Sequence, residues 1–164
     1  MTGVAEVSAR LAAVPPAVFP YFTDPAKYVQ WMGSEATLEA RPGGIYEVRM
    51  SDGFRAAGRF GLVDPPRQVV FTWGFADEKA ASHTLHQAGD ATGGSAMPAG
   101  STRVTVTLEP DGDSGTRLTL RHEDLPNDEL TKAHQTAWET YLPRLAARVA
   151  GADPGPDPHS GAGL

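Results

Sequence analysis

The chain has 164 residues, a length that predicts one domain, and it carries a formal net charge of −6. The acidic balance argues against a nucleic-acid-binding module, and the absence of cysteine from the sequence excludes disulfide bonds, thiol catalysis and cysteine-ligated zinc. No apolar run reaches the roughly 18 residues of a transmembrane helix, and the first ten residues lack the pattern of a secretory signal. We therefore expect a cytoplasmic protein without a membrane or nucleic-acid partner.

The N-terminal part predicts one strand and two short helices. Residues 6–11 alternate between apolar and polar side chains, as in a half-buried strand. The proline pair that begins at Pro15 opens a short helical stretch, although a further proline argues against a long helix. A second short helix is expected to run to residue 33, with Thr23 or Asp24 as its cap.

Later segments alternate with period two, the pattern of strands that bury one face. Turn signals separate them, such as the Asp-Gly pair at 52–53, so neighbouring segments are expected to pair as antiparallel strands. In one of them Phe54, Phe60 and Leu62 share the predicted inner face. The segments are 36–40, 45–50, 54–63, 68–74, 104–108 and 118–122.

The chain closes with one long amphipathic helix, for which Asn127 is a suitable N-cap and Pro143 predicts a kink. Residues 76–101 are small and polar and predict a long flexible loop, which is either functional or mobile. Residues 151–164 are half glycine and proline and predict a disordered tail. A single domain is thus expected over residues 1–150, with a two-layer α+β architecture in which a curved antiparallel sheet wraps around the helix.

Six segments of the sequence carry a likeness to a known family: 24–31, 41–46, 70–73, 101–109, 116–120 and 134–145. They resemble the START-like (SRPBCC) helix-grip superfamily and, within it, the homologues of the activator of heat-shock protein 90 ATPase. The likeness covers roughly residues 4–150 and departs from the family at Ala137-Trp138, where Gly-Trp is common.

The resemblance implies a cavity between the sheet and the last helix. Relatives bind lipids, sterols, polyketides or plant hormones there, and some catalyse cyclisation or dehydration. We expect this chain to bind a small, mostly apolar ligand. The alternatives are a cyclase-, aromatase- or dehydratase-like enzyme and a stress-related, co-chaperone-like interaction protein that meets a chaperone or a second copy of the chain. The eukaryotic co-chaperone carries a second domain for which this chain leaves no room, so direct chaperone activation is not expected.

The candidate ligand-binding residues are those that the strand and helix periods place on inner faces. Aromatic rings supply large apolar areas, and tryptophan, tyrosine and histidine add a polar atom that can orient a ligand. The alternative interpretation is that the rings only fill the core. The set is Trp31, Tyr46, Met50, Phe54, Phe60, Phe71, Trp73, His122, His134, Trp138 and Tyr141.

Trp73, near a strand end, and Trp138, central on the helix, are the strongest members of this set. His122 and His134 could hydrogen-bond a ligand or act as an acid or base, or could be satisfied interior histidines. No catalytic residue is assigned, because no nucleophile, histidine and carboxylate form a recognisable set.

Two further patterns carry weaker hypotheses. His83 and His86 form a His-x-x-His pair without a fixed third ligand, so neither a metal nor another cofactor is expected. Arginines gather on the predicted outer face of the sheet and could meet an anionic partner, or could form a solvated face with cross-strand ion pairs. They are Arg49, Arg55, Arg59, Arg103, Arg117 and Arg121.

Overall fold

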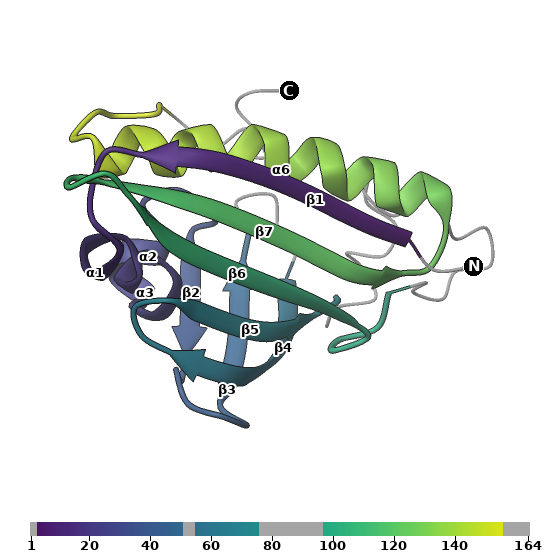
Figure 1. Cartoon of the computed structure of the whole chain (residues 1–164). Coiled ribbons are helices and arrows are strands. Elements are labelled where there is room, and N and C mark those ends of the chain that lie inside the picture. The colour runs from purple at the N-terminus through teal and green to yellow at the C-terminus, as the bar shows by residue number, and fades with distance from the viewer. Residues whose placement is uncertain (1–2, 51–54, 76–96, 156–164) are drawn as a thin grey trace.

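The strands form one antiparallel sheet of seven in the order β1-β7-β6-β5-β4-β3-β2 in a computed structural model that describes residues 3–50, 55–75 and 97–155. The helix α6 runs along the edge strand β1 (Figure 1). The short helices α1, α2 and α3 gather near the C-terminal end of α6 (Figure 1). The elements are β1 (Gly3–Leu11), α1 (Pro15–Val18), α2 (Pro20–Thr23), α3 (Pro25–Tyr28), β2 (Glu35–Leu38), β3 (Ile45–Arg49), β4 (Arg55–Asp64), β5 (Gln68–Trp73), β6 (Thr102–Asp111), β7 (Gly115–Leu125) and α6 (Asp128–Val149). This order confirms the two-layer α+β helix-grip architecture.

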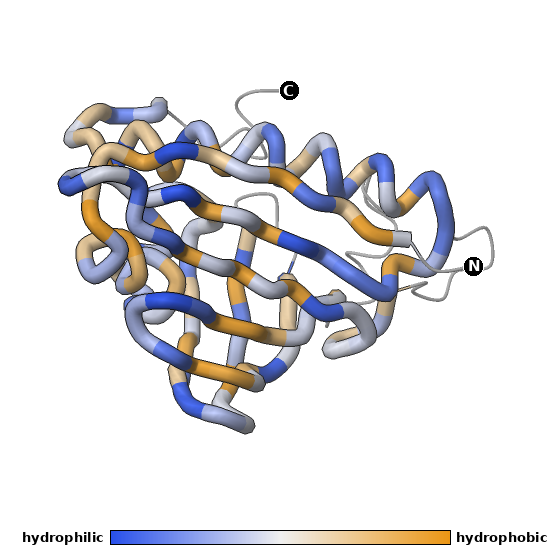
Figure 2. The backbone as a smooth tube through the Cα atoms, viewed as in Figure 1, coloured by the Kyte–Doolittle hydropathy of each residue, from blue (hydrophilic) through white to orange (hydrophobic). Residues whose placement is uncertain are grey.

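Hydrophobic and hydrophilic residues alternate along the strands (Figure 2), and the buried apolar residues of the sheet form one core with those of α6. In β5, Val69, Phe71 and Trp73 are buried while the residues between them are half-buried. The polar residues of the same strands face away from the core, as their period requires. Each of the alternating segments expected from the sequence corresponds to one of the strands β2 to β7.

Irregular pairing shifts this alternation at two places. Phe60 and Val63 of β4 are three residues apart, but their partners on β5, Phe71 and Val69, are only two residues apart. This extra residue in β4 is a bulge, and Leu62 within it is 47% exposed. The placement of Leu62 on the inner face was therefore wrong, because a bulge reverses the side-chain parity that follows it. In β7 a second irregularity, with Asp124 at φ 66°, allows both His122 and Leu125 to be buried.

The N-terminal helices are shorter than expected. Pro20 splits the first helical stretch into α1 and α2, and the second predicted helix ends as an α-helix at Tyr28 instead of residue 33. The Asp24 side chain accepts a hydrogen bond from the backbone N–H of Ala26 (3.0 Å), so of the two candidate caps it is the aspartate that caps α3. Pro20 has no N–H to continue a helix from α1, which accounts for the break.

The long helix begins as expected and remains continuous through Pro143. The Asn127 side chain accepts from the backbone N–H of Leu130 (2.8 Å). Toward the other end, Arg144 Nε donates to the carbonyl of Trp31 (3.0 Å), and this ties α6 to the turn that follows α3. The bend at Pro143 stays a prediction.

Part of the expected loop packs against the sheet. Met97 is fully buried, and its carbonyl accepts from the backbone N–H of Phe75 (2.8 Å). Residues 76–96 lie outside the described part of the chain, as do Phe54 and residues 156–164. Within the residues that the structure describes, no helix has the length and apolar character needed to cross a membrane.

Candidate ligand-binding site

Most of the predicted aromatic residues that the structure describes fall into two groups of different character, and each group also contains rings that were not predicted. The first group fills the end of the core beside the short helices, and we call it the core cluster: Phe22, Tyr28, Trp31, Tyr46, Phe60 and Phe71. Tyr46 stacks on Phe71 with ring centroids 4.1 Å apart. The hydroxyls of Tyr28 and Tyr46 are hydrogen-bonded to each other, and Trp31 Nε1 donates to the carbonyl of Tyr21 (3.1 Å). The polar side-chain atoms of this cluster therefore have partners within the fold.

The second group lies where β5, β7 and α6 meet, and we call it the histidine cluster: Trp73, Phe75, His122, His134 and Trp138. The rings of Trp73 and Trp138 have centroids 5.4 Å apart, and those of His122 and His134 are 5.1 Å apart. Trp73 also contacts Tyr46 of the core cluster at 6.0 Å. The two strongest tryptophan candidates and both histidine candidates are thus brought together.

His122 is fully buried, and both of its ring nitrogens have partners. Trp138 Nε1 donates to its Nδ1 (3.0 Å), because an indole N–H can only donate. The proton of the neutral ring is therefore on Nε2, which donates to Thr102 Oγ1 (2.8 Å). The Thr102 hydroxyl donates in turn to the carbonyl of Trp73 (2.7 Å). This chain of hydrogen bonds fixes one tautomer of His122 and leaves its ring no free polar atom.

His134 has the opposite tautomer and one nitrogen without a partner. Its Nδ1 lies 2.9 Å from the carbonyl of Leu130, one turn earlier in α6, and must donate because a carbonyl oxygen only accepts. Its Nε2 therefore carries a lone pair. Among the buried side-chain nitrogens and oxygens of the described residues, two have no hydrogen-bond partner, and they are His134 Nε2 and Trp73 Nε1.

Burial keeps both histidines neutral. Desolvation lowers the pKa of His134 to about 4, although the hydrogen bond to the Leu130 carbonyl opposes the shift. Desolvation also lowers the pKa of His122 well below its ordinary value, and the nearby His134 adds to this effect. An imidazolium would have to form in a buried, ring-lined environment, which disfavours the charged form.

Two members of the site were not among the residues selected from the sequence. Thr102 is in phase with the buried Val104 and Val106, so the strand period could have identified it as inward. Phe75 follows the end of β5 and is held by its bridge to Pro98, a long-range contact that no local pattern indicates. Of the other candidates, Met50 and Tyr141 are buried in the core, 7% and 2% exposed respectively.

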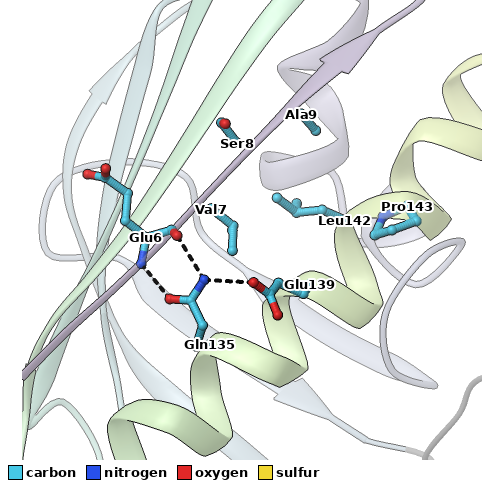
Figure 3. Close-up of a pocket in the computed structure, with 8 residues that line it drawn as sticks. All are labelled: Glu6, Val7, Ser8, Ala9, Gln135, Glu139, Leu142 and Pro143. Carbon is cyan, nitrogen blue, oxygen red and sulfur yellow. Dashed lines mark hydrogen bonds between the residues drawn. The ribbon is translucent and has the colours of Figure 1, made fainter.

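A groove of about 350 Å³ lies elsewhere, between β1 and α6 (Figure 3). The Gln135 amide pairs with the backbone of Glu6, donating to its carbonyl (2.9 Å) and accepting from its N–H (3.0 Å). This pairing occupies the free edge of the sheet at that point. The groove carries two carboxylates and no aromatic ring, so it differs from the expected ring-lined cavity; its lining is Glu6, Val7, Ser8, Ala9, Gln135, Glu139, Leu142 and Pro143.

The outer arginines lie on the exposed face of the sheet, as the strand period predicts. Arg49, Arg55 and Arg121 form ion pairs with glutamates at 2.6–3.9 Å. Exposed pairs of this kind contribute about 0–1 kcal/mol each.

The described residues hold no group of three or more potential metal ligands, and the pair His83 and His86 lies outside them.

Comparison with known proteins agrees with this architecture. Residues 12–150 match the family model described as "Activator of Hsp90 ATPase homolog 1-like protein". The AHSA1-like protein from Rhizobium etli is 38% identical with a TM-score of 0.68, and the match covers 96% of this chain and 88% of that one. The AHSA1 protein from Silicibacter pomeroyi is 26% identical with a TM-score of 0.66, over 90% and 98% of the two chains. No curated protein matches.

A more distant solved structure supports a similarity in fold only. An HSP90 activator from Plasmodium falciparum is 18% identical with a TM-score of 0.65, and the match covers 90% of this chain and 96% of that one.

Proposed function

Because this chain belongs to the family of activator of Hsp90 ATPase homolog 1-like proteins, we propose that it binds a small, mostly apolar ligand between the sheet and α6, beside the histidine cluster. The observation that carries the proposal is the pair of buried polar atoms without partners, Trp73 Nε1 and His134 Nε2. Each unsatisfied buried group costs about 1–3 kcal/mol. A bound ligand that pairs with these atoms would recover that cost, and the surrounding rings would cover its apolar part.

The same geometry favours binding over catalysis. His122 has both nitrogens engaged, so it has no lone pair or proton free for a substrate. His134 has a free lone pair, but burial lowers its pKa to about 4, and a base this weak removes protons poorly at neutral pH. A cyclase- or dehydratase-like reaction therefore lacks a suitable acid or base among these two residues.

An interaction with a chaperone or a second copy of the chain is a weaker proposal. It was suggested by the outer arginines, and three of these are already paired with carboxylates of the same sheet. The charge of these three arginines is therefore balanced within the fold, which weakens the case for an anionic partner at this face. A lipid is one member of the ligand class proposed here, and no feature of the histidine cluster selects a lipid over other apolar molecules.

A screen of small apolar compounds by thermal shift, with native mass spectrometry to count bound molecules, tests the proposal. We expect at least one compound to raise the melting temperature and to bind one per chain. His134→Phe should abolish this binding, because the larger ring occupies the site and removes the acceptor. Gln135→Ala, the adjacent residue of α6 that faces the groove of Figure 3, should leave binding unchanged.

Trp73→Phe is a second variant for the case in which His134→Phe does not fold, because it keeps an aromatic ring and removes only the indole N–H and part of the volume. Binding that survives in both folded variants would place the ligand elsewhere. A screen without any binder to the wild-type chain would contradict the proposed function.

A further inference from the structure

The two unpartnered atoms of the histidine cluster have complementary hydrogen-bonding roles. Trp73 Nε1 carries a hydrogen and can only donate. His134 Nε2 can only accept, since the Leu130 carbonyl holds the single ring proton on Nδ1. A ligand that satisfies both atoms must therefore offer one acceptor and one donor.

These atoms belong to rings that share the same neighbours. The rings of Trp73 and His134 both contact Phe75, each with centroids 6.2 Å apart. Both also contact His122, at 5.9 Å and 5.1 Å. Since Trp73 is 6% exposed and His134 is 2% exposed, the donor and the acceptor lie in one desolvated region of the core.

Few polar groups fit this pair. A carboxylate only accepts and would face the lone pair of His134, and an ammonium only donates and would face the N–H of Trp73. A charged group would also have to leave water for a region without an opposite charge, which is costly. A ketone or an ether satisfies Trp73 alone. A neutral hydroxyl accepts through its oxygen and donates through its hydrogen, so a single group offers both of the roles that these two atoms require.

We propose that the ligand is a neutral, hydroxyl-bearing apolar compound, an alcohol or a phenol, whose hydroxyl accepts from Trp73 Nε1–H and donates to His134 Nε2. This inference rests on the proposed function, because it names the class of ligand for the same site. It assigns separate tasks to the two side chains: Trp73 recognises the oxygen, and His134 recognises the hydrogen.

A matched pair of probes, 2-naphthol and 2-methoxynaphthalene, separates these tasks. The ether keeps the oxygen that Trp73 recognises and lacks the hydrogen that His134 recognises. We expect the wild-type chain to bind 2-naphthol at least about tenfold more tightly than the ether, since a buried acceptor left unpaired is costly. In His134→Leu the two affinities should become equal, while Trp73→Phe should weaken both compounds.

The indole N–H signals in a ¹⁵N–¹H spectrum provide a readout that does not depend on the variants. The chain has three tryptophans, and Trp31 and Trp138 already donate to protein atoms. Addition of 2-naphthol should therefore move the signal of Trp73 the most, toward the position of a hydrogen-bonded indole. Equal affinity of the wild-type chain for the two probes, or no binding of 2-naphthol, overturns this inference. The wider screen of apolar compounds decides the proposed function separately.

Discussion

His122 and His134 face each other edge to face, with ring centroids 5.1 Å apart, and hold their single protons on opposite nitrogens. In His122 the indole of Trp138 occupies Nδ1, and in His134 the carbonyl of Leu130 occupies the same atom. A fixed donor in one case and a fixed acceptor in the other determine which nitrogen is protonated. The first ring is therefore fully engaged, and the second presents a lone pair to its surroundings.

Long-range ¹⁵N–¹H NMR of the imidazole rings tests this assignment. At pH 7 we expect His122 as the neutral Nε2–H tautomer and His134 as the neutral Nδ1–H tautomer, because burial disfavours the imidazolium of both. Thr102→Val should disturb the His122 signals by removing its acceptor, and should leave the tautomer of His134 unchanged. An imidazolium at either position, or one tautomer shared by both rings, would contradict the hydrogen-bond assignment.

For single residues, the sequence predicts which side chains are buried, but it does not predict their hydrogen-bond partners. Strand and helix periods suffice to turn Trp73, His122, His134 and Trp138 inward, and all four are buried. Which nitrogen of each ring has a partner depends on contacts between elements far apart in the chain, such as that between His122 and Thr102. Periodicity carries no information on these contacts, so the distinction between the engaged and the unengaged histidine required the structure.

At the level of the elements, the backbones of strands β4 and β5 approach each other closely at Gly58. A Cβ atom on Gly58 would lie 2.0 Å from the backbone carbonyl oxygen of Thr72, on the neighbouring strand β5. On Gly61, three residues later in the same strand, the nearest atom would be 3.7 Å away, an ordinary contact. Both glycines lie in β4, and they differ in the space that the neighbouring strand leaves.

Gly58→Ala is expected to destabilise the fold by about 1–3 kcal/mol or more, because backbone must shift to relieve the overlap. Gly61→Ala is the matched control and should change the free energy of unfolding by less than about 1 kcal/mol, since alanine is tolerated there and reduces the freedom of the unfolded chain. Urea denaturation of both variants measures the difference. Equal effects at the two positions would show that strands β4 and β5 are not spaced as described.

A bulge within β4 is the feature of this sheet that the sequence could not predict. The bulge between Phe60 and Val63 exposes Leu62, although the period of two places Leu62 on the same face as the buried Phe60. A bulge depends on the register of two strands, and the period of one strand does not contain it. The helix caps are more local: the Asn127 cap of α6 forms as expected.

For the whole molecule, the two buried histidines make stability depend on pH. Their pKa is near 6.5 in the unfolded chain, whereas in the fold burial lowers the pKa of His134 to about 4 and that of His122 well below its ordinary value. Below about pH 6.5 the unfolded chain therefore binds protons that the folded chain does not, and the free energy of unfolding falls as the pH falls. At neutral pH both states are largely deprotonated and this penalty is absent.

Between pH 7.5 and pH 5, His134 alone should lower the free energy of unfolding by about 2 kcal/mol. Urea denaturation at the two pH values measures the loss, and His134→Gln should reduce it by about that amount, since glutamine does not titrate. A wild-type stability that is the same at both pH values, or an unchanged pH dependence in the variant, would mean that His134 is not buried as a neutral ring.

The overall arrangement follows from the order of elements: one strand, short helices, a run of antiparallel strands and a final amphipathic helix permit few two-layer solutions. The interior between the layers does not follow from that order. Tyr46 and Phe71 stack and fill their part of it, while Trp73 and His134 keep polar atoms without partners. That difference arises from side-chain volumes and from contacts such as Phe75 with Met97, which join distant parts of the chain.

Xenon provides the most direct test that the space for a ligand lies at the histidine cluster, because it enters apolar cavities without needing any polar group. We predict that dissolved xenon shifts ¹⁵N–¹H signals in a saturable manner, with the largest changes at the indoles of Trp73 and Trp138 and at the amide of His134. Changes centred on Trp31 in the core cluster, or no saturable change at all, would contradict the account.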